Sequence, residues 1–149
     1  LRKAKNPVIL RPETMGKSAM LGSLEDTLEM SKAIDGVLPC LDFAHLHARP
    51  GDGTVNSAGE WRQILEMYQA SLGKEALKKL HIHLSGIEYG PKGEKNHLAL
   101  GESDLKINFL FEVLRDFGCG GRILCESPIM ETDAELMKKA WMKVSKEKE

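Results

Sequence analysis

Residues 37–49 read Val-Leu-Pro-Cys-Leu-Asp-Phe-Ala-His-Leu-His-Ala-Arg, and this stretch decides which fold the sequence favours. Its first part, Val37 to Asp42, is short and mostly apolar, as expected of a strand buried in a parallel sheet. Its continuation, residues 43–49, becomes polar and leads into the turn Pro50-Gly51-Asp52-Gly53. The stretch therefore predicts a buried strand that presents ionisable side chains where it ends.

Three other segments have the same strand-like character, and helical patterns separate them. The further predicted strands are Pro7–Leu10, Leu80–Ile87 and Arg122–Cys125. The predicted helices run from Ser23 to Gly36, from Ser57 to Leu72, from Asp104 to Asp116, and from a cap at Thr132 or Asp133 through Trp141. A short helical turn is predicted at Glu75–Lys79, a loop at Gly90–Gly101 and a frayed tail at 143–149.

Two details of the helices can be predicted from the residues. Ser23 with Asp26 three residues later forms a capping box for the first helix. In the third helix, apolar spacing predicts that Phe109 faces inward with Leu110 and Val113.

The order of these elements is about four strand-then-helix units, which predicts a parallel sheet flanked by helices. An open doubly wound sheet and part of a (β/α)8 barrel both satisfy this order. A complete barrel needs about 250 residues, so the length of 149 residues alone favours the open sheet. Ionisable residues end every strand, which is where barrel enzymes place their active sites, and we therefore expect an α/β fold of (β/α)8 TIM-barrel type. Because the sequence starts on Leu1 and soon enters a strand, we also expect it to be a fragment.

The bulk composition bounds the class of protein. With 149 residues, 42% hydrophobic and 29% charged, the chain fits one globular domain. A formal net charge of -1 excludes a nucleic-acid binder that works through bulk positive charge, so any DNA contact must be local. An odd count of three cysteines without a Cys-x-x-Cys pair, and no signal peptide or long apolar span, predict a reduced cytoplasmic protein with no membrane segment.

Potential metal ligands gather at the predicted strand ends. They are Glu13, Asp42, His45, His47, His83 with His81 behind it, His97 on the following loop, and Glu126. Carboxylates and imidazoles without a thiolate are typical of hydrolytic zinc or manganese sites, and several of them can hold two or more ions around one phosphate. Cys40 and Cys125 fall inside the strands and not at their ends.

Each of these residues also has an ordinary structural interpretation. A single carboxylate at a strand end is more often a helix N-cap, and a histidine in an apolar strand usually bonds a backbone carbonyl. All five histidines, however, lie between positions 45 and 97, outside the predicted helices, and this favours a ligand role. His81 and His83 share a face, with His83 the better ligand and His81 a supporting or core residue. His47 competes with His45 for the ligand role.

At these residues the sequence resembles the endonuclease IV family of xylose isomerase-like barrels. The family's Cys-x-Asp-x-x-His motif at the sixth barrel strand is reproduced by residues 40–45, the most specific local signal. The segments 12–16, 83–86 and 124–128 resemble the ends of the fifth, seventh and eighth strands, although Glu13 stands one place later than the family's Glu. Lys95 replaces the Asp of the family's Asp-x-His, two residues before His97.

The resemblance implies that residues 1–149 are the C-terminal half of such a barrel, with about four βα units. It implies a phosphodiesterase that cleaves DNA at abasic sites in base excision repair, with two or three zinc ions, or manganese as the alternative. Glu13 would bridge two ions, Asp42, His83 and Glu126 would complete one of them, and His45 with His97 would hold a third. The family also uses two histidines from the first half of the barrel, which this sequence does not contain, so the resemblance implies that residues 1–149 alone cannot complete the first metal site. At the third ion, either Glu94 replaces the missing Asp or the site is weak or empty.

The resemblance also implies roles around the substrate. The ions would bind a phosphodiester and supply hydroxide near neutral pH. Glu126 would orient the attacking water, and Arg49, Lys92 and Lys95 are candidates for phosphate contacts or ordinary surface cations.

Two rival functions remain open from the sequence. One is a sugar isomerase or epimerase of the same superfamily, with Glu13, Asp42, His83 and Glu126 around a single ion. The pair His45 and His97 favours the phosphodiesterase, since a single-ion isomerase has little use for extra imidazoles. The other is a non-catalytic half-barrel that covers its sheet edges by self-association or by pairing with a missing N-terminal half.

Overall fold

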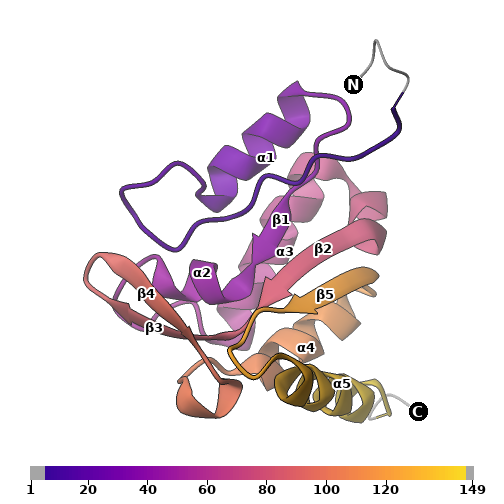
Figure 1. Ribbon diagram of the computed structural model, residues 1–149. Helices are drawn as coiled ribbons and strands as arrows, with labels where there is room; N and C mark the ends of the chain where they lie inside the picture. Colours follow the sequence, from indigo (N-terminus) through magenta and orange to yellow (C-terminus); the bar gives the residue numbers. More distant parts are fainter. Residues whose placement is uncertain (1–5, 147–149) are drawn as a thin grey trace.

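The computed structural model describes residues 6–146, which form an α/β arrangement (Figure 1). The helices are α1 (Leu24–Ala33), α2 (Phe43–Ala48), α3 (Ala58–Leu72), α4 (Ile107–Asp116) and α5 (Met130–Lys146), with short 3-10 helices η2 (Lys74–Lys79) and η3 (Leu100–Glu102). The strands are β1 (Cys40–Asp42), β2 (Leu80–Leu84), β3 (Gly86–Gly90), β4 (Gly93–Leu98) and β5 (Gly121–Cys125).

The main sheet is parallel, with strand order β1-β2-β5. A fourth chain segment lies along its free edge, because Leu10 bridges Val37 and Glu13 bridges Cys40, both in parallel. In chain order, the four parallel segments are separated by α1, α3 and α4, as the sequence predicts. All four therefore bring their carboxyl ends to the same edge of the sheet.

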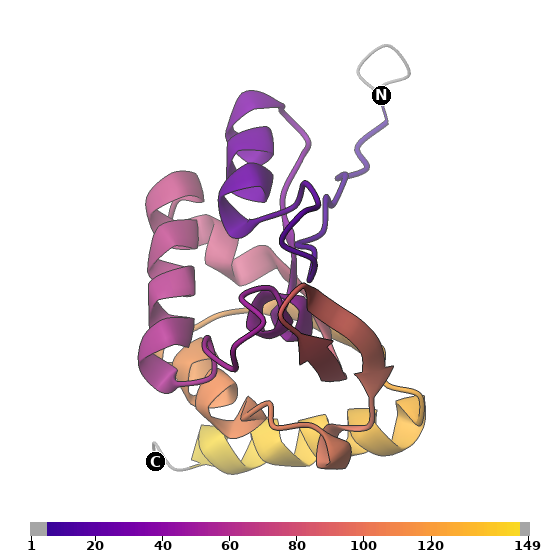
Figure 2. The same ribbon diagram turned by 90° about the vertical axis from the view of Figure 1, so that its left-hand side faces the viewer.

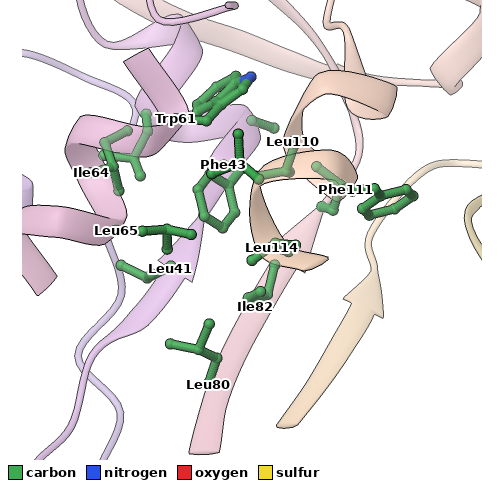
Figure 3. Packing of buried hydrophobic residues seen from close by; sticks show 14 of the residues in the cluster. Leu41, Phe43, Trp61, Ile64, Leu65, Leu80, Ile82, Leu110, Phe111 and Leu114 are labelled. Atoms are coloured by element: carbon green, nitrogen blue, oxygen red, sulfur yellow. The ribbon is translucent and has the colours of Figure 1, made fainter. Parts of the chain in front are cut away.

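The hydrophobic core fills the space between the sheet and the helices, where side chains of β1 and β2 meet those of α3 and α4 (Figure 3). Leu41 and Ile82, 0% and 3% exposed, point into this layer. Because successive strand residues point to opposite faces, the neighbours of Leu41 and Ile82 point to the other face of the sheet. The core thus fixes which side of β1 and β2 carries the ionisable residues.

Helices α1 and α3 both begin with a capping box. Ser23 and Asp26 cap α1 as predicted, and Ser57 and Glu60 cap α3 in the same way. Each box satisfies backbone N–H groups that the first turn of a helix leaves unpaired.

The prediction that residues 7–10 form a buried strand is wrong, because this segment is largely exposed. Within it, one isolated bridge joins Leu10 to Val37, which precedes β1, and Val8, Ile9 and Leu10 are 49%, 41% and 50% exposed. The segment lies at the edge of the sheet, so among the described residues its pairing partner is on one side only.

The polar stretch after β1 is a helix and not a strand continuation. The Asp42 side chain accepts a hydrogen bond from the His45 N–H at 2.8 Å, which caps α2. His45 and His47 consequently lie on a helix, contrary to the prediction that every histidine lies outside helices. The prediction had continued the strand of residues 37–42 through residues 43–49, but the cap at Asp42 starts a helix there.

The predicted third strand and the loop after it form three strands. β2 ends at Leu84, and β3 pairs with β4 as an antiparallel hairpin that lies near the carboxyl ends of the parallel strands (Figures 1 and 2). The turn between them ends at Gly93, whose φ of +93° favours glycine. The residues of the predicted glycine-rich loop are therefore mostly strand.

Smaller differences concern the last two helices. α4 begins at Ile107, later than predicted, and Phe109 is partly exposed and not inward. α5 begins at Met130, ahead of the predicted cap at Thr132 or Asp133, and extends to Lys146 into the predicted frayed tail, whose residues 147–149 lie outside the described residues. Among residues 6–146, none of the helices has the length and apolar character that a membrane crossing requires.

Candidate metal centre

Four side chains from four parallel segments meet at the carboxyl edge of the sheet. The residues are Glu13, Asp42, His83 and Glu126, here called the strand-end group, and each has a ligand atom within 4.8 Å of those of the other three. Asp42 and His83 are register partners across β1 and β2. His83 Nδ1 lies 3.2 Å from Glu13 Oε1 and 3.1 Å from Glu126 Oε1. The sequence predicted these four residues as ligands, and the structure brings them together.

Asp42 is the most deeply placed of the four, with 0% exposure. Its Oδ1 accepts the His45 N–H, but its Oδ2 is buried and has no hydrogen-bond partner. Burial raises the pKa of Asp42 to about 6, while the neighbouring His45 opposes the rise and the carboxylates of Glu13 and Glu126 add to it. A buried carboxylate oxygen without a donor is costly, and a cation would supply the missing partner.

A second set of ligands lies beside the first and shares Asp42. His45 from α2 and His97 from β4 complete it with Asp42, and we call these three residues the histidine group. His45 Nδ1 lies 2.9 Å from the Thr14 carbonyl oxygen, and His97 Nδ1 lies 3.0 Å from the Glu126 carbonyl oxygen. A carbonyl oxygen only accepts, so each Nδ1 carries a proton, and in the neutral ring each Nε2 has a free lone pair.

The two Nε2 atoms face each other at 3.3 Å. Two lone pairs at this distance repel unless a proton or a cation lies between them. A tetrahedral zinc ion with Zn–N bonds of about 2.0–2.1 Å holds two nitrogen ligands roughly 3.3 Å apart. A metal-binding histidine also usually donates its other N–H to a carbonyl or carboxylate, as both do here. The pair therefore has the geometry of two ligands of one ion.

Glu94 adds a carboxylate to the histidine group, and Lys95 does not take part. Glu94 Oε2 lies 3.0 Å from His45 Nε2 and accepts the Gly16 N–H at 3.1 Å. The register of the hairpin explains why, since Tyr89 pairs with Glu94 and Glu88 with Asn96, which makes Lys95 an extra residue in β4. Such a bulge lets Glu94 and His97 reach the same side.

The bulged Lys95 has a different partner. Its Nζ pairs with Glu88 at 3.0 Å on the exposed side of the hairpin. Glu94, and not Lys95, lies beside His45, which is the position it needs if it replaces the missing Asp.

His47 serves the framework and not the ligand set. Its side chain is fully buried, with Nδ1 2.9 Å from the Thr54 carbonyl oxygen and Nε2 3.1 Å from Asp104 Oδ1. Asp104 also accepts the Tyr89 O–H at 2.7 Å. This network joins α2 to the hairpin and to the segment before α4, and it decides the competition in favour of His45.

The three residues predicted to contact phosphate, Arg49, Lys92 and Lys95, lie in different surroundings. The Arg49 guanidinium donates to the backbone carbonyl oxygens of Met15, Lys17, Ser18 and Met20, so it orders the loop after Glu13. We therefore assign Arg49 a structural role. Lys92 is exposed at the hairpin tip, and Lys95 is exposed beside Glu88.

Sequence reasoning also missed a third group of potential ligands. Cys40, His81 and His83 each have a ligand atom within 4.8 Å of the other two. Burial, with the charges of Glu13 and Asp42, raises the pKa of the Cys40 thiol to about 12. The positions of Cys40 and His81 give no local signal, because only the strand register makes them neighbours.

A parallel sheet with helices between its strands, and with carboxylate and imidazole side chains at the carboxyl edge, defines an α/β protein with a candidate metal centre. The chain belongs to the family described as xylose isomerase-like TIM barrel, which it matches over residues 2–146. It is also 45% identical over 134 residues to an uncharacterized protein of Methanocaldococcus jannaschii, covering 90% of this chain and 48% of that protein. The chain thus spans about half the length of this curated relative.

Proposed function

We propose that the protein is a metal-dependent phosphodiester hydrolase similar to endonuclease IV, acting on DNA at abasic sites. The observation that carries the proposal is that the strand-end group and the histidine group share Asp42. A shared carboxylate holds two ions close together, as in two-metal sites that bind both the attacking and the leaving oxygen of a phosphodiester.

The residues present fit such ions. Asp42 Oδ2 is a buried oxygen without a hydrogen-bond donor, and the two groups supply only carboxylate oxygens and imidazole nitrogens. This donor set suits zinc or manganese. The strand-end group would hold one ion, and the histidine group with Glu94 would hold the other. When bound, the ions supply hydroxide near neutral pH and positive charge at the phosphate.

The side chains around the ions have separate tasks in this proposal. The Glu126 carboxylate is partly exposed beside His83, so it can accept a hydrogen bond from the attacking water and orient it. Its backbone carbonyl meanwhile fixes the ring of His97. With a net charge of -1, the chain needs local cations for DNA phosphates, and Lys92 and Lys95 on the hairpin are the candidates.

The rival isomerase reaction requires only the strand-end group and one ion. The apposed Nε2 atoms of His45 and His97 favour the phosphodiesterase, because a one-ion isomerase has no use for a second pair of imidazole ligands at this distance. Metal stoichiometry therefore separates the two functions.

The proposal is tested by metal content and by cleavage of an end-labelled DNA duplex that contains one abasic-site analogue, with the intact duplex as reference. We expect two ions per chain and cleavage only of the abasic duplex. His83→Ala and His97→Asn should each lose an ion and lower cleavage at least tenfold. Glu88→Gln, an exposed carboxylate of the same hairpin, should leave both unchanged. One ion per chain with no cleavage of either duplex would overturn the proposal.

A further inference from the structure

We infer that Cys40, His81 and His83 form a separate, thiolate-containing metal site that competes with the strand-end group for His83. The site would take a thiophilic divalent ion such as zinc or cobalt. It does not depend on phosphodiester hydrolysis, because it requires only that these three side chains bind a metal.

The strand register creates this site. Cys40 pairs with His81 across β1 and β2. Two residues further along the two strands, Asp42 pairs with His83. Side chains two residues apart on a strand share a face, so His81 and His83 lie side by side, with ring centroids 5.3 Å apart. Cys40, 2% exposed, stands against them, and the three ligand atoms lie within 4.8 Å of one another.

The residue types at this level of the sheet are unusual for their place. Inward-facing positions of barrel strands are mostly filled by Val, Ile and Leu, which pack in layers. Here the layer below the strand-end group holds a thiol and an imidazole instead. Arg11 lies nearby, but its guanidinium donates to the carbonyl oxygens of Pro39 and Lys79 at 3.2 Å and 3.0 Å. Those bonds hold this positive charge toward the amino ends of the strands.

The donor set distinguishes this site from the strand-end group. One thiolate and two imidazoles give three ligands of a tetrahedral ion and leave one position open. Soft thiolate favours zinc or cobalt, whereas three carboxylates and one imidazole also accept harder ions such as manganese. Metal binding must displace the thiol proton, as it does in other thiolate sites.

Sharing of His83 makes the two sites alternatives. An ion held by Cys40 and His81 takes His83 from Glu13 and Glu126, its present partners at 3.2 Å and 3.1 Å. The identity of the ion would then decide which site is filled. Manganese would fill the strand-end group, and a thiophilic ion would fill the site formed by Cys40, His81 and His83.

The test is a Co²⁺ titration of the metal-free, reduced protein, read by near-ultraviolet absorption. A thiolate bound to cobalt gives a charge-transfer band there, which carboxylate and imidazole ligands do not give. We expect the band to reach its full intensity at one equivalent and to disappear in Cys40→Ser. His81→Gln changes a partly exposed residue and leaves the Cys40 thiol in place. This substitution should weaken cobalt binding at least tenfold.

Cys125→Ser is the matched control, because Cys125 is also a strand cysteine, although only partly buried, and lies outside the three-residue group. It should retain the band, and so should Glu126→Gln, which removes a ligand of the strand-end group only. Cobalt bound without a near-ultraviolet band, a band that survives Cys40→Ser, or a band lost in Cys125→Ser would each overturn the inference. Cleavage of abasic DNA with manganese is read separately, so failure of the proposed function is distinguishable from failure of this site.

Discussion

His45 Nε2 and His97 Nε2 face each other at 3.3 Å, although their residues lie 52 positions apart in the chain. Backbone carbonyl oxygens fix both rings through Nδ1, so neither ring can turn away without losing a hydrogen bond. The arrangement suits an ion between the two rings, and such an ion would have α2 on one side and the β3–β4 hairpin on the other.

The role of Glu94 can be separated from that of its hairpin neighbours. If Glu94 is a ligand of the ion at His45, Glu94→Gln should weaken that ion's affinity by roughly 10- to 100-fold and leave the other ion bound. Competition with a chromogenic chelator measures both affinities. Glu88→Gln is the control, since Glu88 pairs with Lys95 on the exposed side. Unchanged affinities in Glu94→Gln would mean that the carboxylate only holds the Gly16 N–H.

Asp42 should make the stability of the metal-free protein depend on pH. Burial raises the pKa of Asp42 to about 6, above its value in an unfolded chain, so the folded state retains the proton longer. The contribution of Asp42 to the free energy of unfolding should therefore be fully present below about pH 4, and on the order of 3 kcal/mol should be lost as the pH rises through about 6. Urea denaturation at pH 4, 5, 6 and 7, after removal of metal, measures the fall.

Asp42→Asn should flatten this profile, because an amide does not titrate. Glu102→Gln, an exposed carboxylate, should keep the wild-type profile. Adding zinc at pH 7 to the wild type should raise the free energy of unfolding by about 2.7 kcal/mol at 100 times the dissociation constant. A pH profile that is the same in Asp42→Asn and wild type would contradict the assignment.

The hairpin is held over the site by the hydrogen bond from Tyr89 to Asp104, at 2.7 Å. The Asp104 side chain is 55% exposed, so solvent weakens this bond, and Tyr89→Phe should lower the free energy of unfolding by about 0.5–1.5 kcal/mol. The affinity of the ion at His97 should fall as well, because β4 carries that ligand. A double-mutant cycle with Asp104→Asn isolates the bond. Additive effects of the two substitutions would show that the bond does not hold the hairpin.

Arg49 and Lys92 should behave differently toward DNA. Each phosphate contact changes the slope of log affinity against log salt by about 0.9. Lys92→Ala should reduce the slope by about this amount, whereas Arg49→Met should leave it unchanged and lower the thermal stability, because Arg49 bonds four carbonyl oxygens. Binding to abasic duplex at several salt concentrations measures the slopes. A reduced slope in Arg49→Met and an unchanged slope in Lys92→Ala would instead support a phosphate contact by Arg49.

The sequence by itself determined the alternation of the parallel segments with α1, α3 and α4, the cap at Ser23, and the gathering of Asp42 and His83 at the strand ends. These features depend on local rules: the two-residue period of strands, the 3.6-residue period of helices and short capping contacts. Parallel strands necessarily bring their carboxyl ends to one edge, so the strand-end group followed from the chain order alone.

Only the tertiary structure decided which side chains complete the site. The choice of His45 over His47 depends on the helix that Asp42 caps, and the use of Glu94 depends on the bulge at Lys95 in an unpredicted hairpin. The meeting of Cys40 with His81 depends on the register between β1 and β2. Helix rotation and strand register are set by packing between segments far apart in sequence, and a shift of one residue in a strand moves each side chain to the opposite face.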